Sequence, residues 1–203
     1  MAVTLKRQSR ISRPVGALSK KSLRHECHDF PTRQILATFS TPIGWIGLSG
    51  QNGELTSVYV GHVSPDSIRA RAVVDTTMLE EGDWNPDLRS LFEAYADGEV
   101  VNFESVEIRL PEMTPFRRQI VEATRSLGYG QTVSYGELAL QAGHPGAARA
   151  VGTVMSSNRF PILIPCHRVL AAGGKLGGYT SPAGTRLKQR LLEMESGAVS
   201  GRD

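Results

Sequence analysis

One cysteine and one histidine stand side by side near the end of the chain, as Cys166 and His167, directly after the apolar run FPILI and Pro165. A thiol is a weak nucleophile at neutral pH because its ordinary pKa is about 8.5, and a nearby imidazole makes the thiolate accessible. Because adjacent side chains can point apart, a bridging water could carry the proton from the Cys166 sulfur to the His167 ring. A carboxylate usually accepts a hydrogen bond from the other ring nitrogen of such a histidine. The pair is therefore either a nucleophile with its base or a buried thiol beside a core histidine.

The second cysteine offers weaker chemistry. Cys27 lies in the segment RHECHDF with His25 and His28, a spacing that matches no common zinc site. We expect no metal there and no cofactor in the chain. Two cysteines so far apart form no disulfide framework, and reduced thiols favour a cytoplasmic protein, located in the cytosol or at a nucleoid within it.

Charge is distributed unevenly along the 203 residues, of which 40% are hydrophobic and 21% charged. Residues 1–33 carry eight basic and two acidic side chains, residues 34–110 carry four and twelve, and residues 111–203 carry eleven and six. The last segment is therefore suited to a polyanion such as nucleic acid, and the middle is not. No apolar run approaches the ~18 residues of a membrane span, and the basic start lacks the apolar core of a secretory signal. We expect no membrane partner and a mostly disordered tail over residues 1–33.

The segment 34–110 has the pattern of a small α/β domain with an antiparallel or mixed sheet. QILATFSTPIGWIGLSG and ELTSVYV read as a hairpin or meander with turns at PIG and QNG. Residues 86–98 predict a helix with a proline near its start and a glycine at its end. We expect a strand over 106–110 and a domain boundary at Pro111. No residue pattern in this segment suggests a catalytic or binding site.

The segment 111–203 predicts a mainly α-helical domain. Thr114 and Pro115 begin one helix, and Ser134 with Glu137 forms a capping box at the start of a second. The turn GHPG separates the second helix from a third, AARAVGTVMSSN, which gives a helix-turn-helix on the basic half. We expect FPILI to form a short buried strand before Cys166.

The third of these helices is unusual because its side chains are small. Ala147, Ala148 and Gly152 flank Arg149, the first long side chain on it. Such a helix cannot read a sequence in the major groove, but it can approach a minor groove only ~6 Å wide and insert one arginine. An alanine-rich packing helix with a surface arginine explains the same pattern.

Residues 111–203 resemble the O6-alkylguanine-DNA alkyltransferases, also called methylated-DNA–protein-cysteine methyltransferases. The resemblance rests on TPFRRQIVEA, YGQTVSYGELA, GHPGAARAVG, NRFPILIPCHRV and GGYTSPAG, which follow the family's order near its spacing. The first half is similar to the family's first domain more faintly, through STPIGWIGLSG and PDLRSLFEAYADGE. The resemblance implies DNA repair: an O6-alkylated guanine is flipped out of double-stranded DNA, and Cys166 takes the alkyl group irreversibly, once per molecule.

The resemblance also implies a role for individual residues. His167, through a water, would take the thiol proton, and Tyr135 would give its hydroxyl proton to the guanine ring. Asn158 would brace the turn before Cys166, and Arg149 would fill the gap left by the flipped nucleotide. Pro161, Tyr179 and Thr180 would line the alkyl pocket, and the guanine amine would donate to the Val169 carbonyl. The residues that would contact DNA are Ala147, Ala148, Arg149, Gly152 and Tyr135.

The carboxylate that orients His167 has two candidates, Glu193 and Glu195. Counting from Cys166 as in a tighter relative favours Glu193, but TSPAG makes this chain two residues longer there. Leu187, Leu191 and Glu195 are spaced by four and share an inward helix face, so we predict Glu195. A second departure is Arg159, where some relatives have proline, which adds a charge near the pocket rim.

Three other functions share some of these features. A sensor of alkylated DNA that performs no repair would have its cysteine replaced, and a helix-turn-helix regulator would need a recognition helix with polar side chains. A cysteine hydrolase would need an oxyanion hole, which nothing here suggests. We therefore predict a monomeric, stoichiometric methyltransferase that binds the DNA minor groove with little sequence preference.

Overall fold

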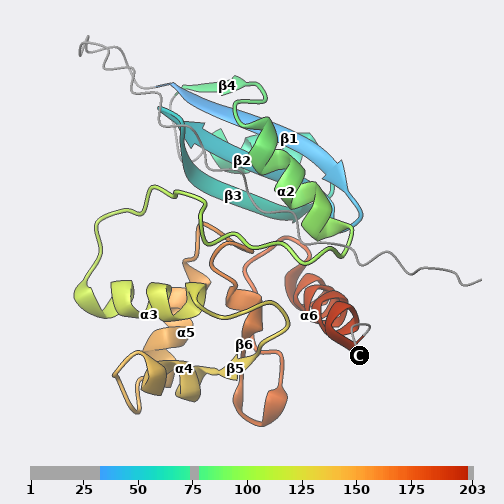
Figure 1. The fold of residues 1–203 in the computed structure, drawn as a ribbon. Helices are drawn as coiled ribbons and strands as arrows, with labels where there is room; N and C mark the ends of the chain where they lie inside the picture. Colours follow the sequence, from blue (N-terminus) through green and yellow to red (C-terminus); the bar gives the residue numbers. More distant parts are fainter. Residues whose placement is uncertain (1–32, 74–77, 201–203) are drawn as a thin grey trace, which may run out of the picture.

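The computed structural model describes residues 33–73 and 78–200, with side chains as far as residue 197. Figure 1 shows a sheet with helix α2 (Pro86–Ala96) in one half of the molecule. The other half contains the helices α3 (Pro115–Arg125), α4 (Tyr135–Gln141) and α5 (Ala148–Ser156), and helix α6 (Gly184–Ser200) lies at the opposite side of that half from α3. The tail predicted over residues 1–33 therefore lies outside the described residues except for Arg33, and so do Cys27, His25 and His28.

The first half is built on an antiparallel meander, as the alternating pattern predicts. β1 (Gln34–Thr41), β2 (Gly44–Gln51) and β3 (Glu54–His62) pair in order, and Asn52 and Gly53 join the last two with φ angles of 54° and 81°. Two successive left-handed residues suit the tight turn that matches strand twist. The sheet order is β3-β2-β1-β4, with β4 (Leu79–Glu81) parallel to β1.

Two features of this half were not predicted and one prediction was wrong. Helix α1 (Pro65–Val73) and strand β4 follow β3, and neither was expected. The strand expected over residues 106–110 does not form, because only Ile108 makes a bridge, to Leu55. The segment is held instead by the Arg109 N–H, which donates to the Leu55 carbonyl at 2.8 Å.

Helix α2 (Pro86–Ala96) carries the apolar face that covers the sheet. The Asn85 side chain accepts from the Leu88 N–H and caps its start. Leu88, Phe92 and Tyr95 are buried, so this face extends from the sheet toward the second half of the molecule.

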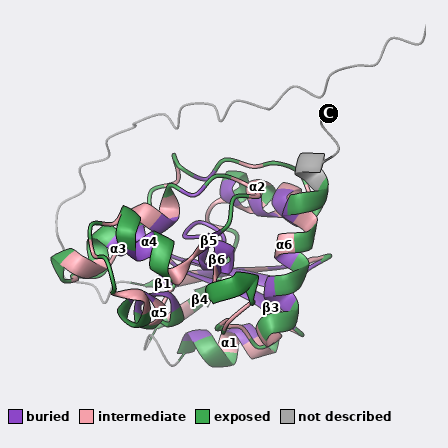
Figure 2. Ribbon diagram, turned by 90° about the horizontal axis from the view of Figure 1, so that it is seen from below, coloured by how far each residue is buried: buried purple, intermediate pink, exposed green. Residues whose placement is uncertain are grey.

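The second half places three capped or tightly turned helices around a short parallel pair of strands. α3 (Pro115–Arg125) begins at the Thr114 cap, and α4 (Tyr135–Gln141) begins at a complete Ser134–Glu137 capping box. α5 (Ala148–Ser156) follows a turn, giving the predicted helix-turn-helix. The remaining elements are β5 (Val133–Ser134), β6 (Val169–Leu170), the 3₁₀ turns η1 (Cys166–Arg168) and η2 (Ala172–Gly174), and helix α6 (Gly184–Ser200), whose buried stripe faces the interior in Figure 2.

The short strand expected before Cys166 is in fact a compact buried loop, and the strand, β6, follows the cysteine. Asn158 closes this loop, since its side chain accepts from the Phe160 N–H and donates to the Ile164 carbonyl. Ile162 takes a φ of 76°, which no strand allows. Short apolar runs predict burial better than conformation, and here the neighbouring asparagine decides the conformation.

The two halves meet along the open edge of β3. The Val58 N–H donates to the Arg159 carbonyl at 2.8 Å, and the Arg159 guanidinium donates to the Ser57 hydroxyl at 3.1 Å. Farther along β3, the Ser181 hydroxyl donates to the Val60 carbonyl at 3.1 Å. The larger of two buried apolar clusters contains side chains of both halves, while Leu36, Tyr59, Ile68 and Ala72 form a smaller separate cluster. The loops on both sides of Cys166 are thus anchored to the first half.

Candidate functional site

Cys166 lies beside a pocket of about 650 Å³ between α4, α5 and the loops that follow β6. Cys166 is buried, with 8% of its surface exposed, and it is the first residue of the short 3₁₀ turn η1. Of the residues predicted to contact DNA or substrate, the pocket lining contains Tyr135, Ala148, Arg149, Gly152, Cys166, Tyr179 and Thr180. A thiol at the wall of an open pocket can meet a small group that enters from the helix-turn-helix side.

Asn158 contacts the sulfur directly. Its Nδ2 group donates to Cys166 Sγ at 3.1 Å and to the Ile164 carbonyl at 2.8 Å. The same side chain therefore closes the loop and fixes the position of the thiol. A donor at this distance also favours the thiolate over the thiol.

His167 turns its ring away from the pocket lining and toward helix α6. Its Nε2 lies 2.9 Å from Glu195 Oε1, and both side chains are fully buried. Because the Glu195 carboxylate is ionised, Nε2 carries the proton and Nδ1 keeps its lone pair. Nδ1 is buried and has no hydrogen-bond partner among the described residues. Burial, the largest cause, lowers the pKa of His167 and so favours the neutral imidazole, although the Glu195 carboxylate acts in the opposite direction.

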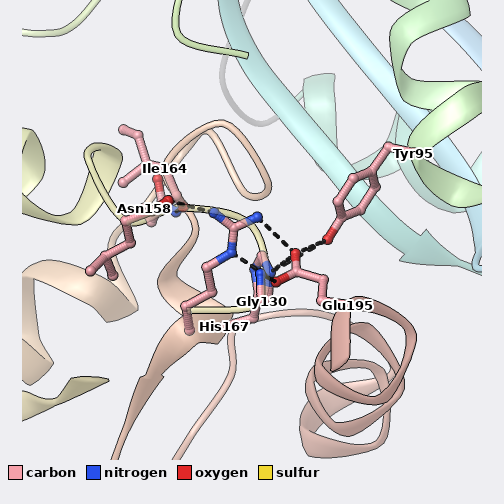
Figure 3. Close-up of polar contacts among 8 residues, drawn as sticks. Tyr95, Gly130, Asn158, Ile164, His167 and Glu195 are labelled. Atoms are coloured by element: carbon pink, nitrogen blue, oxygen red, sulfur yellow. Dashed lines mark hydrogen bonds and ion pairs between the residues drawn. The ribbon is translucent and has the colours of Figure 1, made fainter. Parts of the chain in front are cut away.

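Glu195 is the centre of a buried group that we call the Glu195 cluster, made of Tyr95, Gly130, His167, Arg168 and Glu195. Arg168 donates to both carboxylate oxygens at 2.8 Å, the Tyr95 hydroxyl donates at 2.7 Å, and the Gly130 N–H donates at 3.1 Å (Figure 3). Burial raises the pKa of Glu195, but the hydrogen bonds from His167 and Arg168 more than offset it and hold the pKa far below its ordinary value. The carboxylate therefore stays charged in the interior.

The surroundings of the Cys166 thiol favour its neutral form. Burial, the largest cause, raises its pKa, whereas the Asn158 hydrogen bond and the charge of Lys188 act in the opposite direction. A base must therefore take the proton before Sγ can act as a thiolate nucleophile.

Lys188 is a buried cation whose charge acts on the sulfur. It lies on α6 at 0% exposure, and its Nζ donates to the Val169 carbonyl at 2.6 Å. Burial, the largest cause, lowers its pKa, whereas negative charge on the Cys166 sulfur acts in the opposite direction. The Val169 carbonyl, which was predicted to accept from the guanine amine, thus already accepts a hydrogen bond from Lys188.

Some predicted residues lie outside the pocket wall. Pro161 and Val169 are buried and Ala147 is partly buried, and none of the three belongs to the lining residues. Glu193 is exposed and accepts from the Gln189 side chain on the same helix, so it does not approach His167.

No group of three or more His, Cys, Asp and Glu side chains that could hold a metal occurs within residues 33–73 and 78–200. Within the same ranges, no helix has the length and apolar character needed to cross a bilayer.

The sequence and the fold both match known proteins. Residues 115–197 match the model of the 6-O-methylguanine DNA methyltransferase DNA-binding domain. A methylated-DNA–protein-cysteine methyltransferase of Methanosarcina acetivorans is 36% identical over 160 residues, which cover 78% of this chain and 96% of that protein. The chain belongs to the methylated-DNA–protein-cysteine methyltransferase family.

Further members of the family agree in sequence and in structure. The Mycobacterium bovis methyltransferase is 37% identical over 164 residues, covering 78% of this chain and 90% of its own. The crystal structure of Mycobacterium tuberculosis OGT in complex with DNA superposes with a TM-score of 0.67 at 35% identity, covering 81% of this chain and 94% of that one.

Three residues of this methyltransferase site escaped the sequence reasoning, namely Tyr95, Arg168 and Lys188. Arg168 and Lys188 left a signal: one follows His167 directly, and the other precedes Glu195 by seven, two turns back on the same helix face. Tyr95 left none, because it is separated from Glu195 by 100 positions.

Proposed function

We propose that the protein is a DNA repair methyltransferase that moves the alkyl group of O6-alkylguanine in DNA to Cys166. The observation that carries this assignment is the position of the Cys166 thiol at the pocket wall, 3.1 Å from Asn158 Nδ2 and next to the buried His167–Glu195 pair. In the reaction, Sγ forms a bond to the alkyl carbon while the bond from that carbon to O6 breaks.

The thiol proton passes to Nδ1 of His167 through one water. The Nε2–H bond to Glu195 leaves Nδ1 as the acceptor, and the carboxylate stabilises the imidazolium that forms. Arg168 already neutralises part of this carboxylate, so His167 is a moderate base and releases the proton readily to solvent afterwards.

The leaving guanine takes a proton from Tyr135. The Tyr135 side chain is half-buried in the pocket wall, and burial followed by the nearby Cys166 sulfur raises the pKa of its hydroxyl. The phenol therefore keeps its proton until negative charge develops on the base, which is when a donor is useful.

The product thioether is not a leaving group, so each molecule reacts once. The only other cysteine, Cys27, lies far away in the sequence, and Cys166 is the free cysteine of the described residues. One nucleophile with no resolving thiol fits a stoichiometric acceptor, not a turnover enzyme.

The protein binds DNA, and α5 is the element that we place in the minor groove. Ala148 and Gly152 line the pocket beside the exposed Arg149, so the backbone can approach the duplex closely. Arg149 then occupies the gap left in the base stack by the flipped nucleotide. In this arrangement the protein binds as a monomer and has little sequence preference.

Intact mass after incubation with duplex DNA containing O6-methylguanine tests this function. We expect a gain of ~14 Da on Cys166 that saturates at about one adduct per protein. Tight binding of the lesion without a mass change would assign a sensor of alkylated DNA instead.

A further inference from the structure

Tyr95 belongs to α2 in the first half of the chain, yet its hydroxyl reaches the base of the transfer reaction. The hydroxyl donates to Glu195 Oε1 at 2.7 Å, and its oxygen lies 3.4 Å from His167 Nε2. Figure 3 shows the ring pointing from α2 directly at the carboxylate. The ring itself is fully buried against Phe103 and Tyr129, with ring centroids 5.9 and 6.0 Å away.

The Glu195 Oε1 atom accepts from three donors at once, namely Tyr95, His167 and Arg168. A carboxylate oxygen has two lone-pair directions, so three donors share its negative charge. Every additional donor leaves less charge to stabilise an imidazolium at His167.

We propose that Tyr95 is a positioning residue that limits the basicity of His167 by donating to the same carboxylate oxygen. This inference rests on the proposed function, since it concerns the base that serves Cys166. It makes the first half of the chain a contributor to the chemistry as well as to the fold.

The other groups that face His167 act through full charges. Glu195 on α6 raises its basicity, while Arg168 on η1 and Lys188 on α6 lower it. Tyr95 is the neutral contributor among them, and it comes from α2. Phenylalanine would fill the same space in the core, so the hydroxyl is explained by its polar contacts and not by packing.

The test is the Tyr95→Phe variant of the full chain, measured by single-turnover transfer across pH. Loss of the donor leaves more carboxylate charge for the imidazolium, so the pKa of His167 rises. On acidification, His167 is then protonated at a higher pH than in the unmodified protein. The acidic limb of the plot of transfer rate against pH therefore moves to higher pH. Below that limb, we expect transfer to slow about three- to tenfold. Duplex DNA and free O6-benzylguanine should be affected equally, and the DNA affinity should not change.

A matched control separates this effect from packing. Phe92→Leu alters the same buried face of α2 near Phe103 and carries no polar group, so it should lower the melting temperature and leave the limb in place. The His167 ring signal in NMR should titrate at higher pH in Tyr95→Phe and be unchanged in Phe92→Leu.

Two outcomes would overturn the inference. In the first, neither the acidic limb of the transfer rate nor the His167 titration shifts along the pH axis in Tyr95→Phe. In the second, both shift by the same amount in Phe92→Leu as in Tyr95→Phe. Either leaves the proposed function intact as long as the unmodified chain transfers the alkyl group. Failure of the unmodified chain to transfer would refute the proposed function instead.

Discussion

Replacing Glu195 by glutamine should destabilise the protein strongly, because the carboxylate accepts from five donor groups: Arg168 Nε and Nη2, the Tyr95 hydroxyl, the Gly130 N–H and His167 Nε2. An amide keeps one acceptor oxygen and turns an NH₂ group toward the other donors. If its oxygen occupies the Oε1 position, the NH₂ faces Arg168 Nε and the Gly130 N–H, and the buried guanidinium loses its counter-charge. Breaking one partner of a buried ion pair costs about 3–5 kcal/mol.

Urea unfolding of Glu195→Gln beside Glu193→Gln measures this cost. Glu193 is exposed, so its variant should stay within about 0.5 kcal/mol of the unmodified protein. Single-turnover transfer should slow at least about tenfold in Glu195→Gln only, and the pKa of Cys166 should rise in that variant because an imidazolium is no longer stabilised.

The same variant should also change the dependence of stability on pH. The folded-state pKa of Glu195 is depressed, so its stabilisation is present above the unfolded pKa of about 4.3 and is lost as the pH falls toward the folded value. Glu195→Gln should remove that part of the acid sensitivity. A Glu195→Gln protein as stable and as active as Glu193→Gln would refute the reasoning about the Glu195 cluster.

Three further predictions concern the sulfur, the DNA-facing helix and the basic tail. Cys166→Ala should abolish the mass gain and leave DNA affinity near its normal value, since the thiol makes no phosphate contact; residual transfer at a hundredth of the normal rate would contradict the assigned nucleophile. Arg149→Ala should slow duplex repair by about 1–3 kcal/mol in barrier but hardly affect free O6-benzylguanine, and equal slowing would indicate a structural role. Removing residues 1–32, with seven basic and two acidic side chains, should reduce the salt slope of DNA binding and leave transfer at saturating DNA intact; an unchanged slope would exclude the tail from the interface.

Local chemistry made much of the fold predictable. The meander, the capped starts of α3 and α4 and the helix-turn-helix depend on residues close together in sequence, such as Thr114 and the Ser134–Glu137 pair. α1 was missed because it buries only Ile68 and Ala72, too little to give a helical pattern. β4 was missed because three residues are too few to show alternation.

In the candidate site, too, local sequence predicts some residues, while others depend on contacts between distant segments. Helical spacing predicts that Glu195 shares the inward face of Leu187 and Leu191, and all three are buried. The contact of Tyr95 with Glu195 depends on how two distant helices dock, which no local pattern encodes. The apolar run FPILI showed that its residues are buried, but the loop conformation depends on side-chain hydrogen bonds from Asn158.

The way the second half covers β3 has a consequence for how the chain is made. β3 is an edge strand, and its partners Arg159 and Ser181 lie about a hundred residues later in the sequence. During synthesis, the sheet emerges with Val58 and Val60 still unpaired along that edge, and an open edge invites pairing with another chain. A fragment that stops at Pro111 should therefore aggregate through β3. Once it has been made, the segment that carries the acceptor cysteine protects this edge from other chains.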